Sequence, residues 1–133
     1  MTKDEEEEGF VGAYSTKAFN NSEDAKKRLL MAAEKGDTKA QFTLGSRNQQ
    51  GHYGPPHPQN FVAWYSKSAA GGYPHGYWML GICHEFGLGV PIDYDKAERC
   101  YLQAIKQGHK PSVMALDRVL ARNPSSTLRI PQD

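Results

Sequence analysis

Residues 40–75, AQFTLGSRNQQGHYGPPHPQNFVAWYSKSAAGGYPH, align without a gap on residues 76–111, GYWMLGICHEFGLGVPIDYDKAERCYLQAIKQGHKP. The identical pairs are residue types that stop helices or fill cores: Leu44/Leu80, Gly45/Gly81, Gly51/Gly87, Pro55/Pro91, Tyr65/Tyr101 and Gly72/Gly108. A fixed period of this size is typical of repeat architectures, in which each unit buries its apolar face against the next. The sequence therefore predicts an array of 36-residue units.

The same register continues outward from these two copies. Residues 22–37 match the second half of a unit, and residues 110–123 match the first half. The predicted domain, residues 22–123, thus contains a half repeat 22–37, a repeat 38–73, a repeat 74–109 and a half repeat 110–123. The acidic segment 1–21 and the segment 124–133 are predicted to be disordered tails.

Local signals divide each unit into two helices. Asp37 and Asp93 are of a residue type that caps helix N-termini, and a glycine follows most of the apolar periodic runs. The loop 52–58 holds three prolines and a glycine, so it cannot be helical. The expected helices are 38–50, 59–70, 75–86, 94–107 and 111–122, preceded by one that starts near Ser22. No run alternates with period two over six residues, so no sheet is expected.

Gly45 and Gly81 lie inside predicted helices, at the same place in both copies. A glycine in a helix interior costs about 1 kcal/mol relative to alanine. Its presence in both copies predicts a packing reason, namely that the missing side chain lets the paired helix come close. A backbone that contacts a ligand is the less favoured alternative.

The residues resemble a known repeat. The segments Ala40–Gly45 and Trp64–Gly72 are similar to the opening and the second helix of the Sel-one-like repeat, and the second copy supplies Leu80–Gly81, Gly87–Val90 and Asp95–Ala97. The resemblance covers about residues 24–116. The chain departs from the pattern at Gly76, where the family has alanine, and at Cys100, where it has tryptophan.

The resemblance implies an all-α fold, an α-α superhelix (solenoid) of antiparallel helix pairs related to tetratricopeptide repeats. It also implies a non-catalytic interaction module, an adaptor, scaffold or regulatory subunit, that binds a peptide or helix of a partner protein. Two alternatives remain open. One is a hydrolase related to cysteine-rich members of the family, and the other is a structural protein that self-associates through the ends of the solenoid.

Composition excludes several other classes. Charged residues make up 23% of the 133 residues, and the net charge is +1. Without residues 1–9 the remainder carries fifteen basic and ten acidic residues, which is too mild for a nucleic-acid-binding signature. No apolar run approaches the length of a membrane span, and the N-terminus lacks the apolar segment of a secretory signal. The expected location is therefore the cytoplasm.

Candidate catalytic and metal-binding residues are sparse. Cys83 and His84 are neighbours, but adjacent residues on a helix diverge by about 100°, so they do not form a nucleophile–base pair. His52 and His57 share a loop without a nearby carboxylate or cysteine. The prediction is no catalytic residue, no metal and no cofactor, with Cys83 and Cys100 as reduced thiols.

Partner contacts are expected on the concave face, which the first helix of each pair usually lines in helical solenoids. Residues that differ between copies there are the candidate specificity carriers: Gln41, Arg47, Asn48, Tyr77, His84 and Glu85. Arg47 and Tyr77 are the predicted anchors, because arginine and tyrosine are enriched among interface hot spots.

Overall fold

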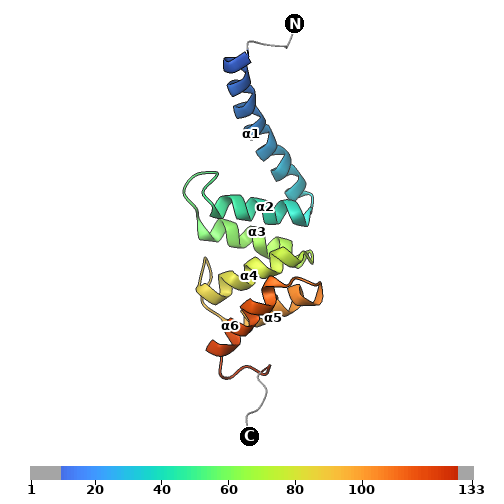
Figure 1. The fold of residues 1–133 in the computed structure, drawn as a ribbon, viewed down its shortest axis with the longest axis vertical. Coiled ribbons are helices and arrows are strands. Elements are labelled where there is room, and N and C mark those ends of the chain that lie inside the picture. The colour runs from blue at the N-terminus through green and yellow to red at the C-terminus, as the bar shows by residue number, and fades with distance from the viewer. Residues whose placement is uncertain (1–9, 129–133) are drawn as a thin grey trace.

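The computed structural model describes the backbone of residues 10–128 and the side chains of residues 22–128. It contains six helices and, within residues 10–128, no strand. The helices are α1 (Phe10–Glu34), α2 (Thr38–Gln49), α3 (Pro58–Ala70), α4 (Pro74–Phe86), α5 (Tyr94–Lys106) and α6 (Pro111–Arg122) (Figure 1). This confirms the predicted all-α class, and the predicted bounds of α2 to α6 agree within one residue.

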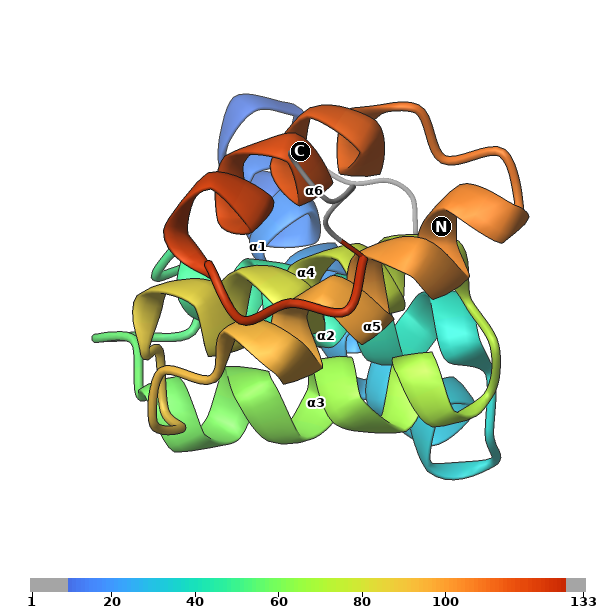
Figure 2. The same cartoon turned by 90° about the horizontal axis from the view of Figure 1, so that it is seen from below.

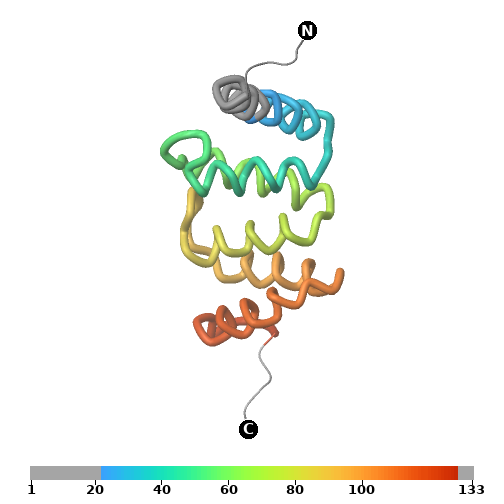
Figure 3. Tube along the Cα trace, turned by 45° about the horizontal axis from the view of Figure 1, so that its top comes forward, coloured from blue at the N-terminus to red at the C-terminus, as the bar shows by residue number. Residues whose placement is uncertain are grey.

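The helices form one stack. Each packs against its neighbours in sequence, and α2 also contacts α4. Successive helices overlie one another along the stack (Figure 2), and α1 and α6 lie at its opposite ends (Figure 3). The arrangement is the predicted solenoid, in which α2–α3 and α4–α5 are the two complete pairs.

The predicted caps are present. The carboxylate of Asp37 accepts a hydrogen bond from the backbone N–H of Ala40, and Asp93 accepts one from Lys96, each at 3.0 Å. Helices α3, α4 and α6 begin with a proline, whose missing N–H costs nothing in a first turn. Gly72 and Gly108, which follow α3 and α5, have φ angles of 90° and 84°, a conformation that favours glycine.

The glycines inside α2 and α4 have the packing role that the repeat predicts. The ring of Tyr65 lies on Gly45, where an added Cβ would be 2.7 Å from Cε1, and Tyr101 lies on Gly81, where that distance would be 2.6 Å. Tyr65 donates a hydrogen bond to Gln49, and Tyr101 donates one to Glu85, both at 2.6 Å. Each unit therefore locks its two helices together by a tyrosine seated on a glycine.

Three core clusters follow the repeat. Their buried members are Ala33, Ala40 and Leu44 in the first, Phe61, Val62, Tyr65 and Cys83 in the second, and Ala97, Tyr101, Ala115 and Val119 in the third. Each cluster joins an odd-numbered helix to the even-numbered helix that follows it. Both cysteines are free, with Cys83 buried and Cys100 partly buried.

Two predicted boundaries differ from the structure. Helix α1 begins at Phe10, not near Ser22, because Ser22, Glu23 and Asp24 are compatible with a helix interior as well as with a helix start. The disorder predicted for segment 1–21 therefore does not hold for residues 10–21, which are helical, whereas residues 1–9 lie outside the described part of the chain.

The segment after α6 is also ordered as far as residue 128. Ser126 donates a hydrogen bond to Glu98 at 2.6 Å, and Asn123 donates one to the same carboxylate. In the repeat register Ser126 corresponds to Val90 and Glu98 to Val62, two residues of the same apolar cluster. Residues 123–128 thus correspond to the loop that follows α2 and the loop that follows α4, and they have a hydrogen-bonded polar pair where the α4 loop has two packed valines. Of the predicted tail 124–133, only residues 129–133 lie outside the described part of the chain.

Helix α6 breaks the register at one position. Asp117 stands where Gly45 and Gly81 stand in the two complete repeats. It is exposed, since within residues 10–128 no helix follows α6 to cover it.

Candidate partner-binding site

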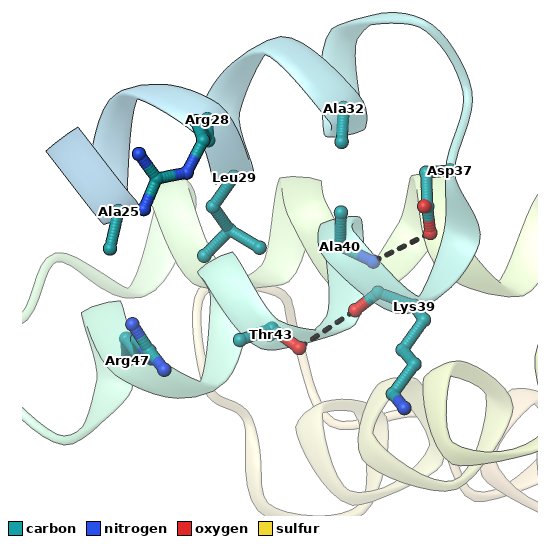
Figure 4. Close-up of a pocket in the computed structure, with 9 residues that line it drawn as sticks. All are labelled: Ala25, Arg28, Leu29, Ala32, Asp37, Lys39, Ala40, Thr43 and Arg47. Atoms are coloured by element: carbon teal, nitrogen blue, oxygen red, sulfur yellow. Dashed lines mark hydrogen bonds between the residues drawn. The ribbon is translucent and has the colours of Figure 1, made fainter.

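Helices α1 and α2 enclose an open cavity of about 400 Å³, which we call the α1–α2 wedge. Figure 4 shows the side chains that line it: Ala25, Arg28, Leu29, Ala32, Asp37, Lys39, Ala40, Thr43 and Arg47. Helix α1 leaves the stack at an angle to α2, so the two helices separate with distance from the turn that joins them (Figure 1). The floor is apolar, and the charged side chains lie around it.

The repeat register shows how this junction differs from the other two. At the next junction the positions of Ala25 and Thr43 are held by Phe61 and Met79, which fill the space between α3 and α4. The position of Leu29 is held by Tyr65 there. The third junction, between α5 and α6, has Ala97 and Ala115 at the positions of Ala25 and Thr43 and is nevertheless a buried core. What both closed junctions share, and the first lacks, is a tyrosine at the position of Leu29.

Arg47 occupies a core position of the repeat. Its counterparts are Cys83 in α4 and Val119 in α6, both with 0% exposure and both packed against the preceding helix. Arg47 is exposed and lines the wedge instead. A cation thus stands where both other copies have a buried apolar side chain, which is the feature that most distinguishes this junction.

Two arginines face the wedge from opposite helices. Arg28 of α1 and Arg47 of α2 lie at one end, and Asp37 and Lys39 lie at the other end, near the start of α2 (Figure 4). Among residues 22–128, the guanidinium groups of Arg28 and Arg47 have no hydrogen-bond or ion-pair partner. The Asp37 carboxylate caps α2 through Ala40.

Two of the six predicted contact residues, Gln41 and Glu85, are buried and therefore cannot contact a partner on the surface. Gln41 is 7% exposed, and its side-chain amide donates a hydrogen bond to the carbonyl of Ala33 at 2.9 Å. Glu85 is 1% exposed. The sequence places both on the partner-binding face because they differ between copies, but each is held inside by partners that the local pattern does not reveal.

Glu85 is the centre of an ion-paired network. Its carboxylate accepts hydrogen bonds from Tyr101 at 2.6 Å and from Arg118 at 2.6 and 2.7 Å, and Arg122 lies 3.4 Å away. Burial alone would raise the pKa of Glu85, but the hydrogen bonds from Arg118 and Tyr101 and the charges of Arg118 and Arg122 outweigh it and hold the pKa below its ordinary value. Both arginines also stack on the ring of Phe86. The network ties α4, α5 and α6 together.

The other predicted residues do not form one face with Arg47. Arg47 corresponds to Cys83, which follows Tyr77 by six residues on the same helix, so the two predicted anchors point about 120° apart. Tyr77, Asn48 and His84 are half-buried. Burial first, and then the charge of Lys96, lower the pKa of His84, whose Nδ1 is buried without a partner among the described residues.

A row of rings links α2, α4 and the start of α6, and the sequence did not single it out. Phe42 contacts Tyr73 and His75, His75 lies 4.7 Å from His109 between ring centroids, and His109 lies 5.1 Å from Trp78. His109 Nδ1 is 2.8 Å from the hydroxyl of Ser112. His75 and His109 are 34 residues apart (109 − 75), two fewer than the 36-residue period, so the repeat register does not pair them.

This row predicts a dependence of stability on pH. Burial, and then the charge on His75, lower the pKa of His109 from its ordinary value of 6.5. As the pH falls, the unfolded chain therefore takes up a proton before the folded chain does, and the stability that is present above pH 6.5 is lost as the pH falls below it.

We expect the free energy of unfolding, measured with urea, to fall between pH 7.5 and pH 5. His109→Gln should reduce that slope, and His52→Gln, in an exposed loop, should leave it unchanged. Equal slopes in all three proteins would contradict this role.

The structure gives no support to the hydrolase alternative. The thiol of Cys83 is fully buried, and burial raises its pKa to about 12, so it stays a protonated core side chain at neutral pH. Burial raises the pKa of Cys100 to about 11. Within the described residues, no group of three or more histidine, cysteine, aspartate or glutamate side chains could hold a metal ion.

Stacked antiparallel helix pairs with a repeated tyrosine–glycine lock define a helical-repeat protein of the α-solenoid class. The sequence model of the Sel1 repeat, the Sel-one-like repeat of the sequence analysis, matches residues 38–73 and 74–109. The chain therefore belongs to the Sel1 repeat family. Proteins with this repeat are generally protein-interaction modules and are typically non-catalytic.

Similar proteins support the same assignment. A Sel1 repeat protein from Oxalobacter formigenes is 33% identical, covers 68% of each chain and superposes with a TM-score of 0.65. A protective antigen of uropathogenic Escherichia coli with an SLR fold is 30% identical over 73% of this chain and 21% of that one, with a TM-score of 0.69. DAP3-binding cell death enhancer 1 of Rattus norvegicus is 33% identical over 73% of this chain and 19% of its own length. The chain spans about a fifth of the length of the first three curated relatives and 7% of the length of a fourth.

None of the helices within residues 10–128 has the length and apolarity needed to cross a membrane.

Proposed function

We propose that the chain is a non-catalytic protein-interaction module that binds a peptide or a helix of a partner protein in the α1–α2 wedge. The observation that carries the proposal is the open junction itself, where Arg47 replaces a side chain that is buried in both other copies. A repeat array gains nothing in stability from leaving one junction unfilled, because each junction normally buries apolar surface. A cavity with apolar walls and a few polar groups is the usual form of a binding site.

Of the six contact residues predicted from the sequence, the α1–α2 wedge contains one. Arg47 is kept as a contact, and Gln41 and Glu85 are excluded by burial. Tyr77 points to another side of its helix and contributes no contact to the wedge. The self-associating alternative and the cytoplasmic location stay predictions.

The test fills the wedge without changing its charge. Ala25→Phe with Thr43→Met gives the first junction the side chains that Phe61 and Met79 supply at the second. Peptides would first be selected on the wild-type protein from a random display library. We expect the filled variant to bind them at least about tenfold more weakly, which corresponds to about 1.4 kcal/mol.

A matched control adds the same bulk elsewhere. Ala63→Phe with Ser66→Met places identical side chains on exposed positions of α3, and its affinity should equal that of the wild type. Undiminished binding by the filled variant would show that the selected peptides bind outside the wedge and would refute the proposal.

A further inference from the structure

The charges around the wedge indicate which kind of segment it takes. Its lining contains Arg28, Lys39 and Arg47 and a single acidic residue, Asp37, whose carboxylate already caps α2. Arg28 and Arg47 come from opposite helices and lie at the same end of the wedge (Figure 4). The lining is therefore positive and carries two guanidinium groups without a partner among residues 22–128.

The register shows that these cations are particular to this junction. Arg28 corresponds to Trp64 and Cys100, and Arg47 corresponds to Cys83 and Val119. The position of Arg47 is a fully buried core position in both other copies, so a charged residue there is not explained by random variation of the surface. Arginine is also the side chain that binds carboxylates in a bidentate manner.

The apolar lining beside the arginines favours a peptide over a polyanion. Ala25, Leu29, Ala32 and Ala40 form an apolar surface between the charged ends. A polypeptide can place a carboxylate on each arginine and an aliphatic side chain on that surface, whereas a phosphate backbone has no apolar group to bury there.

We infer that the α1–α2 wedge binds an acidic, partly aliphatic segment of a partner protein, with at least one carboxylate on Arg28 and one on Arg47. This inference rests on the proposed function and specifies its ligand. The interaction consists of charge-assisted hydrogen bonds at an open site, so added salt should weaken it.

The probe is a synthetic peptide, fluorescein-Glu-Leu-Glu-Leu-Glu-amide, with the label on its N-terminal amine, and its matched version with glutamine at each glutamate. Fluorescence anisotropy with the full chain should show binding of the glutamate peptide and at least roughly tenfold weaker binding of the glutamine peptide. Arg28→Ala with Arg47→Ala should reduce binding of the glutamate peptide by a similar factor. The control is Arg99→Ala with Lys106→Ala, which removes the same charge from exposed positions of α5 and should leave the affinity unchanged.

Each contrary result has a separate meaning. If both double variants weaken binding equally, net charge and not the wedge attracts the peptide, and the inference falls. If an oligothymidine of equal charge competes more tightly than the peptide, the site takes phosphates and the inference falls. If the protein binds the probe only after Asp4 and Glu5 to Glu8 are made neutral, the wedge belongs to the chain's own acidic run and not to a partner.

The proposed function has its own readout. Display-selected peptides that lose affinity in the filled variant but not in Arg28→Ala with Arg47→Ala would keep the wedge as a binding site and would reject acidic ligands. Loss of affinity in neither variant would remove both proposals together.

Discussion

Gly81→Ala is expected to lower the free energy of unfolding by about 2 kcal/mol, although alanine is the better helix former by about 1 kcal/mol. The added Cβ would lie 2.6 Å from Cε1 of Tyr101, which is fully buried and fixed by its hydrogen bond to Glu85. The ring cannot turn away without breaking that bond, so the helices must separate. Urea unfolding of wild type and variant would measure the effect.

A double-mutant cycle isolates the cause. Tyr101→Leu removes the ring and introduces the side chain that Leu29 supplies at the same position of the first half repeat. In that background Gly81→Ala should become neutral or stabilising by up to about 1 kcal/mol, since only the helix propensity remains. A Gly81→Ala variant of the otherwise wild-type chain that is more stable than wild type would disprove the tyrosine–glycine lock.

Arg118→Met with Arg122→Met is expected to cost about 3 kcal/mol of stability, because it leaves a buried carboxylate without a compensating charge. The Glu85 side chain has 0% exposure, whereas those of Arg118 and Arg122 are 42% and 47% exposed. The loss therefore comes from the desolvated glutamate and not from the surface arginines. Adding Glu85→Gln to the double variant should restore most of the stability, since a neutral amide needs no countercharge.

The same variants should differ in their response to acid. In the wild type the pKa of Glu85 lies below its ordinary value of 4.5, so its contribution is present above that pH and is lost as the pH falls through the folded-state pKa. Without the two arginines burial raises that pKa, and protonation then stabilises the folded state. The difference in stability between variant and wild type should shrink as the pH is lowered from 7 towards 4.5, and a constant difference would contradict this account.

Local signals were sufficient to predict the helices and their internal packing. Asp37 and Asp93 mark helix starts, glycines mark most ends, and Gly45 and Gly81 in the same register predicted close helix contact before any ring could be assigned to them. These features involve residues close in sequence or related by a fixed period. A single chain carries that information directly.

The site required information of another kind. Glu85 reads as a surface residue until Arg118, thirty-three positions away, is placed beside it. The sequence predicts Arg47 as a contact because it differs between the two copies, and as an anchor because arginine is common at interfaces. Only the structure shows that its counterparts, Cys83 and Val119, are fully buried. The cavity depends on the angle between α1 and α2, which no local pattern encodes.

Asp117 has a consequence for how such a chain can grow in evolution. Tandem duplication of a unit after α4 would set a new tyrosine on Gly81, so this contact is kept when copies are added in the middle of the array. The same duplication after α6 would set the tyrosine on a carboxylate, burying a charge without a partner. A lineage could lengthen this array by inserting units at its centre, whereas extension beyond α6 would first require that aspartate to mutate to a residue without a charged side chain.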